Sequence, residues 1–562
     1  MRNAVIIFAG AAALASWLAP NHYPPWLSFH AEVAMAVAVL LAFVGAAAGR
    51  VDGQEVVSPF ASVCLVLAAV PFIQMLFGKV FFFGDALLVS AYVTAFVLAQ
   101  ICGRLLARQE GPERFFETVS ALLVSAGIAS VGLQLCQWLG VGGLGIFMAD
   151  MPPNGRPYAN VAQLNHVATM LVLGVVGVLY LCQREKIGSW TAALACCYLA
   201  FGLVMTSSRT AWLEMVVVAG TLIVCRRWDQ FRVGRSAAVL LAAGFVALLL
   251  AWRPLNDALL LSPGRTLADQ MAAGPRILLF QTMWDALLLH PWVGFGWGQG
   301  LVAQLAVVQA HPAGGRLIES SHNLVLDLLV WNGIPLGLLI CGVSVGWAVF
   351  HFRQRKGPAV AFMLCAIAVV FVHAMLEYPL SYLYFLLPVG LLMGAVDSTT
   401  SMRGQVLVGR RSVIAMIAAS AALLAAITFE YIQIESNVRT LRFELARIGS
   451  AVIVSEVPDL HLLTQWGAYL RFVRSEATPA MSEADIATMR KVAERFPYSP
   501  ALLRYAEANA LNGHPDRAAA TLRDLCALHG ARRCAESLAA WHRLSSESYP
   551  QLSKIELPSP GV

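Results

Sequence analysis

Residues 320–350 have the sequence SSHNLVLDLLVWNGIPLGLLICGVSVGWAVF, in which a short polar segment leads into a long apolar run. A helix needs about 20 predominantly apolar residues to cross a bilayer, and this run exceeds that length. Of the 562 residues in the chain, 58% are hydrophobic and only 13% are charged, whereas a soluble domain carries roughly 25% charged residues. We therefore expect most of the chain to lie in a membrane.

From this run and the other apolar runs in the chain, we predict an all-α, polytopic membrane protein with about 13 transmembrane helices over residues 1–429. A second, helical domain is predicted over residues 430–562. The predicted spans are 4–19, 31–48, 61–77, 86–103, 118–139, 163–182, 189–205, 211–225, 236–252, 323–350, 358–375, 381–397 and 412–429.

Basic residues lie mainly in one alternating set of short loops, as at Arg184 and Lys186 or at Arg353 and Lys356. Short loops rich in Lys and Arg stay in the cytoplasm, so the N-terminus is predicted to be cytoplasmic. Loop 253–322 and the tail are then expected on the outer, periplasmic face. Because the net charge of +6 reflects this topology, nucleic acid is not expected as a partner.

The two predicted external parts differ in composition. Loop 253–322 is too long to be a simple connection, and it contains an amphipathic stretch near Arg276–Leu289. In the tail, Glu483–Arg495 has helical spacing. Segment 500–529 is typical of a helical hairpin, with a turn at 512–515 and a tetratricopeptide-like pattern of small residues. Packing against the membrane domain or docking of a partner would suit such a tail.

Eleven cysteines are present, and nine of them lie within apolar spans as small hydrophobic residues. Cys526 and Cys534 lie in the tail, where an oxidising compartment would allow them to pair. Two free thiols are the alternative. The cysteine spacing is not typical of a metal site, so neither a metal nor a cofactor is expected.

His322 is the first candidate catalytic residue. It ends the long external loop, next to Asn323, and imidazole accepts a proton near neutral pH. A structural histidine at the entrance of a span is the alternative. Arg209 lies in the tight external hairpin 206–210, where a guanidinium can form two parallel hydrogen bonds to a phosphate; contact with lipid headgroups is its alternative. Arg276 and Arg265 offer further cations, and Arg265 also suits a solvated loop charge.

A second group of polar residues surrounds the outer ends of two other spans. Asn160 and Gln163, together with His166, are predicted to share a helical face by their spacing. Their side chains suit hydrogen bonding to sugar hydroxyls or phosphate oxygens, and capping of the span entrance is the alternative. His373 and Glu377 are four residues apart and would orient a base, bind an acceptor or form a buried structural pair. The members of the group are Arg156, Asn160, Gln163, Asn165, His166, His373 and Glu377.

A histidine base and several arginines at an outer membrane boundary, with no metal ligands, suit transfer from a polyprenyl diphosphate. The diphosphate is a good leaving group and needs stabilisation of its growing negative charge, which arginines supply. The acceptor hydroxyl needs a base. This combination predicts a single inverting displacement.

Residues 205–395 contain four motifs in this order: Ser208-Arg209; Arg276 followed by Trp284; His290 to Gly296; and Ser321-His322-Asn323 with Asn332-Gly333. By these motifs and their order, the region resembles the O-antigen ligase and polymerase superfamily. Segments Arg156–Met170, Tyr23–Glu32 and Gln74–Asp85 are similar to the signature of protein-glycosylating ligases, and the tail is similar to that of pilin-glycosylating ligases.

This resemblance implies a protein O-oligosaccharyltransferase of the bacterial inner membrane. Such an enzyme moves a glycan en bloc from undecaprenyl diphosphate to Ser or Thr of an exported acceptor protein such as pilin. By resemblance, His322 would be the base, and Arg209 and Arg276 would bind the diphosphate. The alternatives are a ligase to lipid A core sugar, a chain polymerase, and a transporter of the lipid-linked glycan. Transporters usually place charged groups near the bilayer midplane, whereas these residues lie at one boundary.

Overall fold

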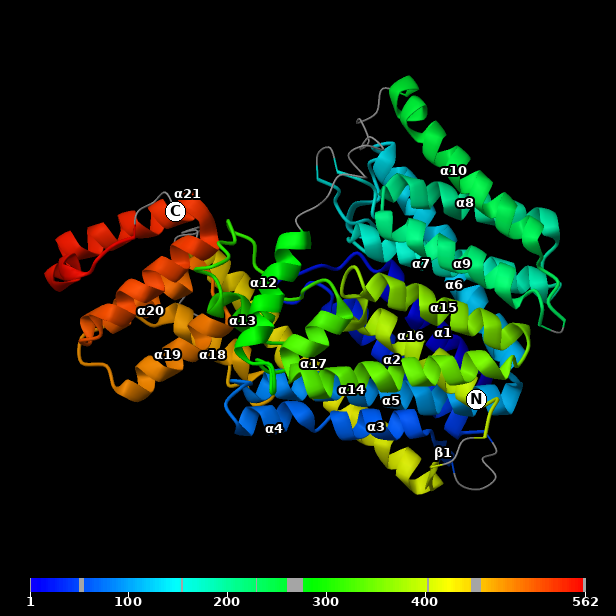
Figure 1. Ribbon diagram of the computed structural model, residues 1–562, viewed down its shortest axis with the longest axis horizontal. Helices are drawn as coiled ribbons and strands as arrows, with labels where there is room; N and C mark the ends of the chain where they lie inside the picture. The colour runs from blue at the N-terminus through cyan, green and yellow to red at the C-terminus, as the bar shows by residue number, and fades with distance from the viewer. Residues whose placement is uncertain are drawn as a thin grey trace. The chain divides into compact units, whose positions relative to one another are not determined.

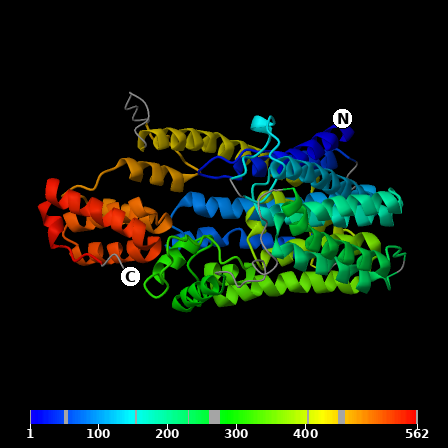
Figure 2. The same cartoon turned by 90° about the horizontal axis from the view of Figure 1, so that it is seen from above.

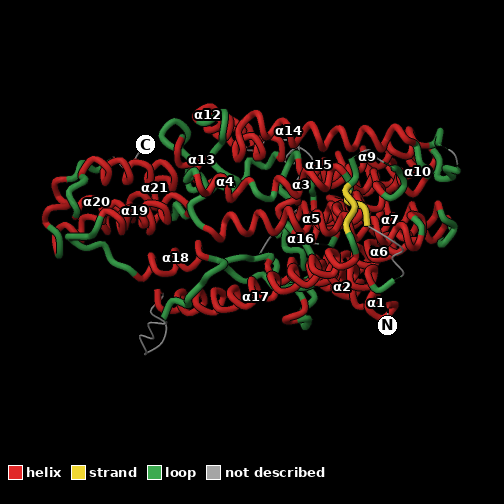
Figure 3. The backbone as a smooth tube through the Cα atoms, turned by 90° about the horizontal axis from the view of Figure 1, so that it is seen from below, coloured by secondary structure: helices red, strands yellow, loops and turns green. Residues whose placement is uncertain are grey.

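The computed structural model describes residues 2–49, 55–152, 155–228, 230–259, 276–401, 404–445 and 456–558. Helix dominates the described chain, as predicted (Figure 3). Two short strands were not predicted: β1 (Glu55–Val57) pairs antiparallel with β2 (Val406–Val408), with Val56 opposite Leu407. Each strand has three residues, which is too short for an alternating pattern to be recognised in the sequence.

The chain divides into two compact units that interleave along the sequence. The first comprises Met1–Leu67, Tyr92–Ala273 and Val343–Ala425, and the second comprises Ala68–Ala91, Gly274–Gly342 and Ala426–Val562. Three helices have residues in both units: α5 (Phe83–Glu110), α14 (Leu324–Gln354) and α17 (Arg410–Leu445). The second unit thus contains the tail together with two earlier segments.

The first unit is a bundle of helices, several of which run side by side in both cartoon views (Figures 1 and 2). The central helix of this unit is α7 (Leu164–Gln183). Of its most apolar 18-residue stretch, 83% is buried inside the protein. A helix that is apolar on all sides is expected to be enclosed by other helices, and α6, α8, α9 and α15 pack on it. The helices of this unit are α1 (Arg2–Leu18), α2 (Phe29–Ala47), α3 (Pro59–Leu67), α6 (Pro112–Trp138), the 3-10 helix Gly145–Phe147, α7 (Leu164–Gln183), α8 (Ser189–Thr206), α9 (Arg209–Cys225), α10 (Arg235–Ala258), α15 (Pro358–Ala374), the 3-10 helix Pro379–Ser381 and α16 (Leu383–Asp397).

Twelve of the thirteen predicted spans fall on one helix each, whereas span 61–77 falls on two, α3 and α4 (Val70–Leu76). Nine helical stretches among the described residues are long and apolar enough to cross a membrane. The chain is therefore a multi-pass membrane protein. Two boundaries differ from prediction. Arg253 and Pro254 belong to the last turns of α10 rather than to the following loop. The predicted span 323–350 is interrupted at Gly333, whose φ of 77° is not helical.

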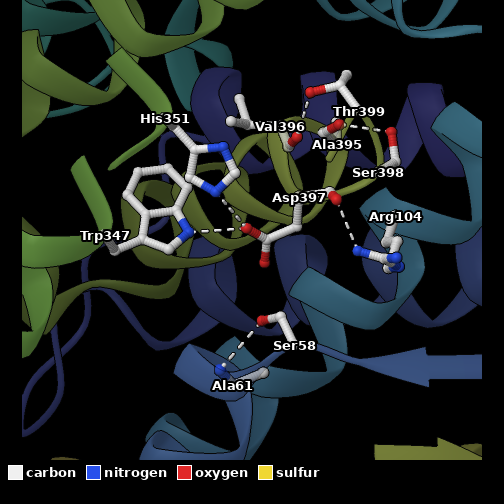
Figure 4. A network of polar contacts seen from close by, with 10 residues as sticks. All are labelled: Ser58, Ala61, Arg104, Trp347, His351, Ala395, Val396, Asp397, Ser398 and Thr399. Carbon is white, nitrogen blue, oxygen red and sulfur yellow. Dashed lines mark hydrogen bonds and ion pairs between the residues drawn. The ribbon is translucent and has the colours of Figure 1, made fainter. Parts of the chain in front are cut away.

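A buried polar network closes one end of the first unit (Figure 4). Asp397, the last residue of α16, accepts a hydrogen bond from Trp347 Nε1 at 2.8 Å, and His351 Nε2 lies 2.9 Å from the same oxygen. Arg104 of α5 donates to the Asp397 carbonyl at 2.7 Å. His351 and Asp397 are 0% and 1% exposed. The polar network therefore joins the C-terminal ends of α14, α16 and α5.

The second unit contains the helical tail, where the predicted helix Glu483–Arg495 is α19 and the predicted hairpin is formed by α20 and α21 (Figure 1). A disulfide joins Cys526 to Cys534 across Gly530, where α21 changes direction with a φ of 73°. Of the two alternatives for these cysteines, the structure has the pair. The helices that lie wholly in this unit are α4 (Val70–Leu76), α12 (Arg276–Leu289), α13 (Gly300–Ala306), α18 (Thr464–Arg474), α19 (Glu483–Arg495), α20 (Ser499–Leu511), α21 (Pro515–Glu547) and the 3-10 helix Pro550–Lys554.

The tail packs directly on the segment that precedes His322. The amides of Ala313 and Gly315 donate to the carbonyls of Ala527 and Leu528 at 2.9 and 2.7 Å. Val308 is buried in the same apolar cluster as Leu525 and Leu528 of α21. Backbone hydrogen bonds and apolar packing therefore both join segment 308–315 to α21.

Candidate functional site

His322 lies in a left-handed backbone conformation, with a φ of 57°. For a residue other than glycine this conformation costs about 1–2 kcal/mol, so the surrounding structure has to hold it. The His322 amide donates to Ser320 Oγ at 3.0 Å. Ser320 and Ser321 are 6% and 0% exposed, whereas His322 itself is half-buried. The backbone that carries the imidazole is thus held by buried serines.

Asp327 supplies that support from the first turn of α14. Ser320 Oγ donates to one carboxylate oxygen at 2.5 Å, and the Ser321 amide donates to the other at 2.6 Å. Asp327 is 4% exposed. Hydrogen bonds to a charged group stabilise a fold by about 1.5–3 kcal/mol each, which is enough to offset the strain at His322.

Asn323 caps α14. Its Oδ1 accepts from the Leu326 amide at 3.0 Å, and its carbonyl accepts from the Asp327 amide at 2.9 Å. Asparagine is favoured at this position because its side chain satisfies an amide that the helix leaves unpaired. These contacts give Asn323 a role in beginning the helix that follows His322.

The Gly and aromatic segment 290–298 pairs with the interruption of α14. The amides of Phe295 and Gly296 donate to the carbonyls of Val330 and Trp331 at 2.8 and 3.1 Å. Gly333 tolerates no side chain, because an added Cβ would lie 2.4 Å from the Trp292 carbonyl carbon. Two motifs that the sequence analysis treated separately are therefore one structural feature.

Gln74 joins this feature to the N-terminal part of the second unit. Its amide nitrogen donates to the Trp331 carbonyl at 3.0 Å and to Asn332 Oδ1 at 3.1 Å, and its oxygen accepts from the Trp297 amide at 2.8 Å. No individual role was predicted for Gln74. An amide inside the predicted apolar span 61–77 was the available signal.

Arg276 is the first described residue after the gap 260–275 and begins α12. The predicted stretch near Arg276–Leu289 forms this helix, which buries Met283 and Leu287 and leaves Trp284 and Leu288 half exposed. Ile277 and Leu289 are exposed as well, so its amphipathic character is not confirmed. His311 Nε2 lies 2.7 Å from Asp285 Oδ2 on α12. Arg265 lies outside the described residues.

Arg209 belongs to the first unit and begins α9 after a sharp turn. α8 ends at Thr206, Ser207 has a left-handed φ of 49°, and Ser208 precedes the new helix. Arg156 donates to the carbonyls of Thr206 and Ser207 at 2.8 and 3.4 Å. Arg156 therefore stabilises the end of α8, next to Arg209.

A chain of hydrogen bonds leads from this turn to Glu377. Ser208 Oγ donates to Asn165 Oδ1 at 2.7 Å, and Asn165 Nδ2 donates to Glu377 Oε1 at 2.9 Å. The structure therefore brings two predicted site residues together beside Arg209. Sequence reasoning predicted both residues but not the link between them.

His166 and His373 are fully buried, and their ring centroids lie 5.3 Å apart. His166 Nδ1 lies 2.8 Å from the Tyr384 hydroxyl, and His373 Nδ1 lies 2.7 Å from Thr169 Oγ1. Thr169 also donates to Glu214 at 2.5 Å. His373 is therefore buried against Thr169 and the His166 ring, and the three interpretations given for His373 and Glu377 stay predictions. Glu214 was missed, although an acid within an apolar run is a signal of a special role.

Asn160 and Gln163 do not share a helical face, contrary to prediction. α7 begins only at Leu164, Asn160 lies in the preceding turn, and Gln163 is extended. Asn160 is 2% exposed and bonds through both side-chain atoms to the backbone of Leu18, Phe147 and Ala149 at 2.7–2.9 Å. Asn160 thus joins the loop before α7 to the end of α1.

Two family models match parts of the chain. A family model described as O-Antigen ligase matches residues 194–341, which include Arg209, Arg276 and His322. A model described as Virulence factor membrane-bound polymerase, C-terminal, matches residues 361–543.

Two curated relatives come from Acinetobacter baylyi. A general O-oligosaccharyltransferase is 32% identical over 420 residues, which is 71% of each chain. A ComP-specific O-oligosaccharyltransferase is 25% identical over 329 residues, which is 58% of this chain and 59% of the relative.

The helical multi-pass fold and these matches define a membrane glycosyltransferase. The chain belongs to the O-antigen ligase family and is an oligosaccharyltransferase of O-linked protein glycosylation. The family resemblance predicted from the sequence is confirmed.

Proposed function

We propose that this enzyme transfers a preassembled glycan en bloc from undecaprenyl diphosphate to Ser or Thr hydroxyls of an exported protein. The proposal rests on the left-handed backbone conformation of His322, which is held by the hydrogen bonds of Ser320 and Ser321 to Asp327. Strained conformations of this kind are enriched at functional sites. His322 also lies within the segment that matches the O-antigen ligase model.

In the proposed reaction, the acceptor oxygen attacks the anomeric carbon of the glycan as the bond from that carbon to the diphosphate oxygen breaks. His322 takes the hydroxyl proton, and the electron pair of the broken bond leaves with the diphosphate. Arg209 and Arg276 stabilise the negative charge that grows there, and Arg265 is a third candidate for this role. The displacement inverts the anomeric centre and uses no metal.

The remaining polar residues support the same site in this proposal. Asn165 and Glu377 hold the turn that presents Arg209, and Arg156 holds the end of α8. Asn323 fixes the helix after His322. Contacts to the glycan are proposed for Gln163, which is half-buried. Asn160, His166 and His373 shape the first unit through buried contacts.

We place the enzyme in the bacterial inner membrane with about 13 spans and a cytoplasmic N-terminus. The site and the tetratricopeptide-like tail then lie in the periplasm. The exposed apolar side chains of Trp284 and Leu288 support a position of α12 at the membrane surface. A membrane domain over 1–429 and a tail over 430–562 remain the proposed functional division.

The acceptor is proposed to be a protein, because both curated relatives are named as O-oligosaccharyltransferases. One relative is named as general and the other as specific for ComP. A pilin is the acceptor we propose for this chain. Loss of lipopolysaccharide side chains with intact protein glycans in a deletion strain would instead support a ligase to lipid A core.

The test is transfer by the purified enzyme from a lipid-linked donor to an acceptor protein, measured as intact protein mass. His322→Ala is expected to lose turnover while the protein still folds. His311→Ala is the matched control, since His311 is a loop histidine of the same unit that pairs with Asp285. Wild-type turnover in His322→Ala would remove His322 from the mechanism.

A further inference from the structure

The geometry points to Asp327 as the positioning residue of the proposed base: its carboxylate sets the orientation of His322 through Ser320. This inference rests on the proposed role of His322. Asp327 lies five positions along the chain, on a helix that the sequence presents only as an apolar span.

Both oxygens of the Asp327 carboxylate are used, and each holds a different part of the loop. One accepts from the Ser321 backbone amide at 2.6 Å and fixes the main chain directly before His322. The other accepts from the Ser320 hydroxyl at 2.5 Å. Because the carboxylate and both serines are buried, water does not compete well for these bonds.

The second contact continues to His322 itself. The Ser320 hydroxyl donates a hydrogen bond to Asp327, and the same oxygen accepts one from the His322 amide at 3.0 Å. That amide belongs to the residue with a φ of 57°. Since φ determines where Cβ and the imidazole point, the chain from Asp327 through Ser320 determines the direction of the proposed base.

A carboxylate suits this position better than an amide of the same shape. Asparagine offers one oxygen, which satisfies only one of the two donors. Its nitrogen would donate to Ser320 Oγ and leave the serine proton without its acceptor. Asp327→Asn therefore disturbs the link to His322 while preserving side-chain volume.

Asp327 also stabilises the N-terminus of α14 by its charge, so a structural effect has to be separated from positioning. Glu430 provides a matched control, because its carboxylate is also buried and accepts from the amides of His461, Leu462 and Leu463 at 2.8–3.0 Å. Glu430→Gln makes the same chemical change at a clamp that does not contact the His322 loop.

The experiment measures kcat and the KM for the lipid-linked donor in the full-length, detergent-purified enzyme. Asp327→Asn is expected to lower kcat by about tenfold to a hundredfold, as a small misplacement of a reacting group does, with an unchanged KM. Ser320→Ala, which leaves α14 intact, is expected to lower kcat in the same direction. Glu430→Gln is expected to keep the wild-type kcat.

A double variant decides whether Asp327 acts through His322. In a His322→Ala background, where long incubations measure the residual rate, adding Asp327→Asn is expected to cause no further loss. A further loss there would overturn the inference, and so would wild-type kcat in both Asp327→Asn and Ser320→Ala. Full activity of His322→Ala alone would instead overturn the proposed function.

Discussion

Arg209 and His322 both lie at turns that contain a residue with a left-handed backbone conformation. In each case a residue other than glycine has a left-handed backbone conformation, Ser207 before Arg209 and His322 itself, and serines lie beside it. A strained turn fixes the direction of the side chain that follows more tightly than a flexible loop does. The two groups are therefore held in place before any substrate binds, at the cost of local strain.

Arg209→Lys is expected to lower turnover by at least tenfold, about 1.4 kcal/mol of transition-state stabilisation. Lysine keeps the positive charge but loses the planar fork that binds two phosphate oxygens together. The measurement is the initial transfer rate at saturating acceptor. Arg227→Lys serves as the control, because that arginine lies in a predicted cytoplasmic loop. Equal rates for Arg209→Lys and the wild type would argue against binding of the diphosphate by Arg209.

Asn165→Ala is expected to weaken donor binding because it breaks the chain from Ser208 to Glu377 that holds the Arg209 turn. We expect the KM for the lipid-linked donor to rise severalfold. Asn256→Ala is a comparison in the same unit, since Asn256 is also buried and accepts from Trp138 Nε1 at 2.9 Å. A similar rise in both variants would indicate a general loss of stability instead.

Sequence patterns identified polar residues at turns and near the ends of spans, including the buried His166 and His373, but missed the acids Asp327 and Glu214. Arg209 and His322 were predictable because they interrupt or precede apolar runs. Asp327 and Glu214 lie inside apolar runs, where their partners are backbone and side-chain groups from elsewhere in the chain. A sequence shows that such an acid is unusual but does not show which group it holds.

At the scale of elements, α14 combines two functions on either side of Gly333. The helical segment before Gly333 carries Asn323 and Asp327, and the one after it continues as an apolar span. Sequence periodicity predicted a single helix here because the residues on both sides are apolar. The interruption arises from segment 290–298, which packs its backbone against Gly333, a contact that local patterns do not encode.

Gly333→Ala is expected to reduce both thermal stability and activity. An alanine there would be strained by its positive φ, about 1–2 kcal/mol, and its Cβ would meet the Trp292 carbonyl. The control is Gly342→Ala on the same helix, where an added Cβ meets nothing within 4 Å. Because alanine favours helix, that variant is expected to be as stable as the wild type or more so. Equal behaviour of the two variants would contradict the proposed packing.

At the scale of the whole molecule, composition and charge predicted a multi-pass helical protein, and the structure confirms it. The division into two interleaved units could not be predicted, because the second unit gathers three segments that are far apart in sequence. Its internal contacts include the ion pair between Asp85 and Arg495, with two hydrogen bonds of 2.9 and 3.0 Å. A contact between residues so far apart in the sequence depends on tertiary packing, so local sequence patterns do not predict it.

Removal of the tail disulfide is expected to impair activity although it lies outside the reacting groups. Cys526→Ser should destabilise the second unit by about 2–3 kcal/mol and loosen the carbonyls that hold Ala313 and Gly315. The measurements are thermal unfolding and turnover, each with and without reductant. Cys197→Ser, at an exposed free cysteine, is expected to match the wild type. Unchanged unfolding of Cys526→Ser would refute this prediction.

The pairing of Ala313 and Gly315 with Ala527 and Leu528 has a consequence for biosynthesis. A ribosome makes the stretch before His322 long before it makes its backbone partners in α21. During that interval the nascent chain can insert its helices into the bilayer, but this stretch still lacks the part of α21 that it binds. Maturation of the enzyme therefore waits for nearly the last part of the polypeptide, and prematurely terminated products would occupy the membrane without attaching sugar to anything.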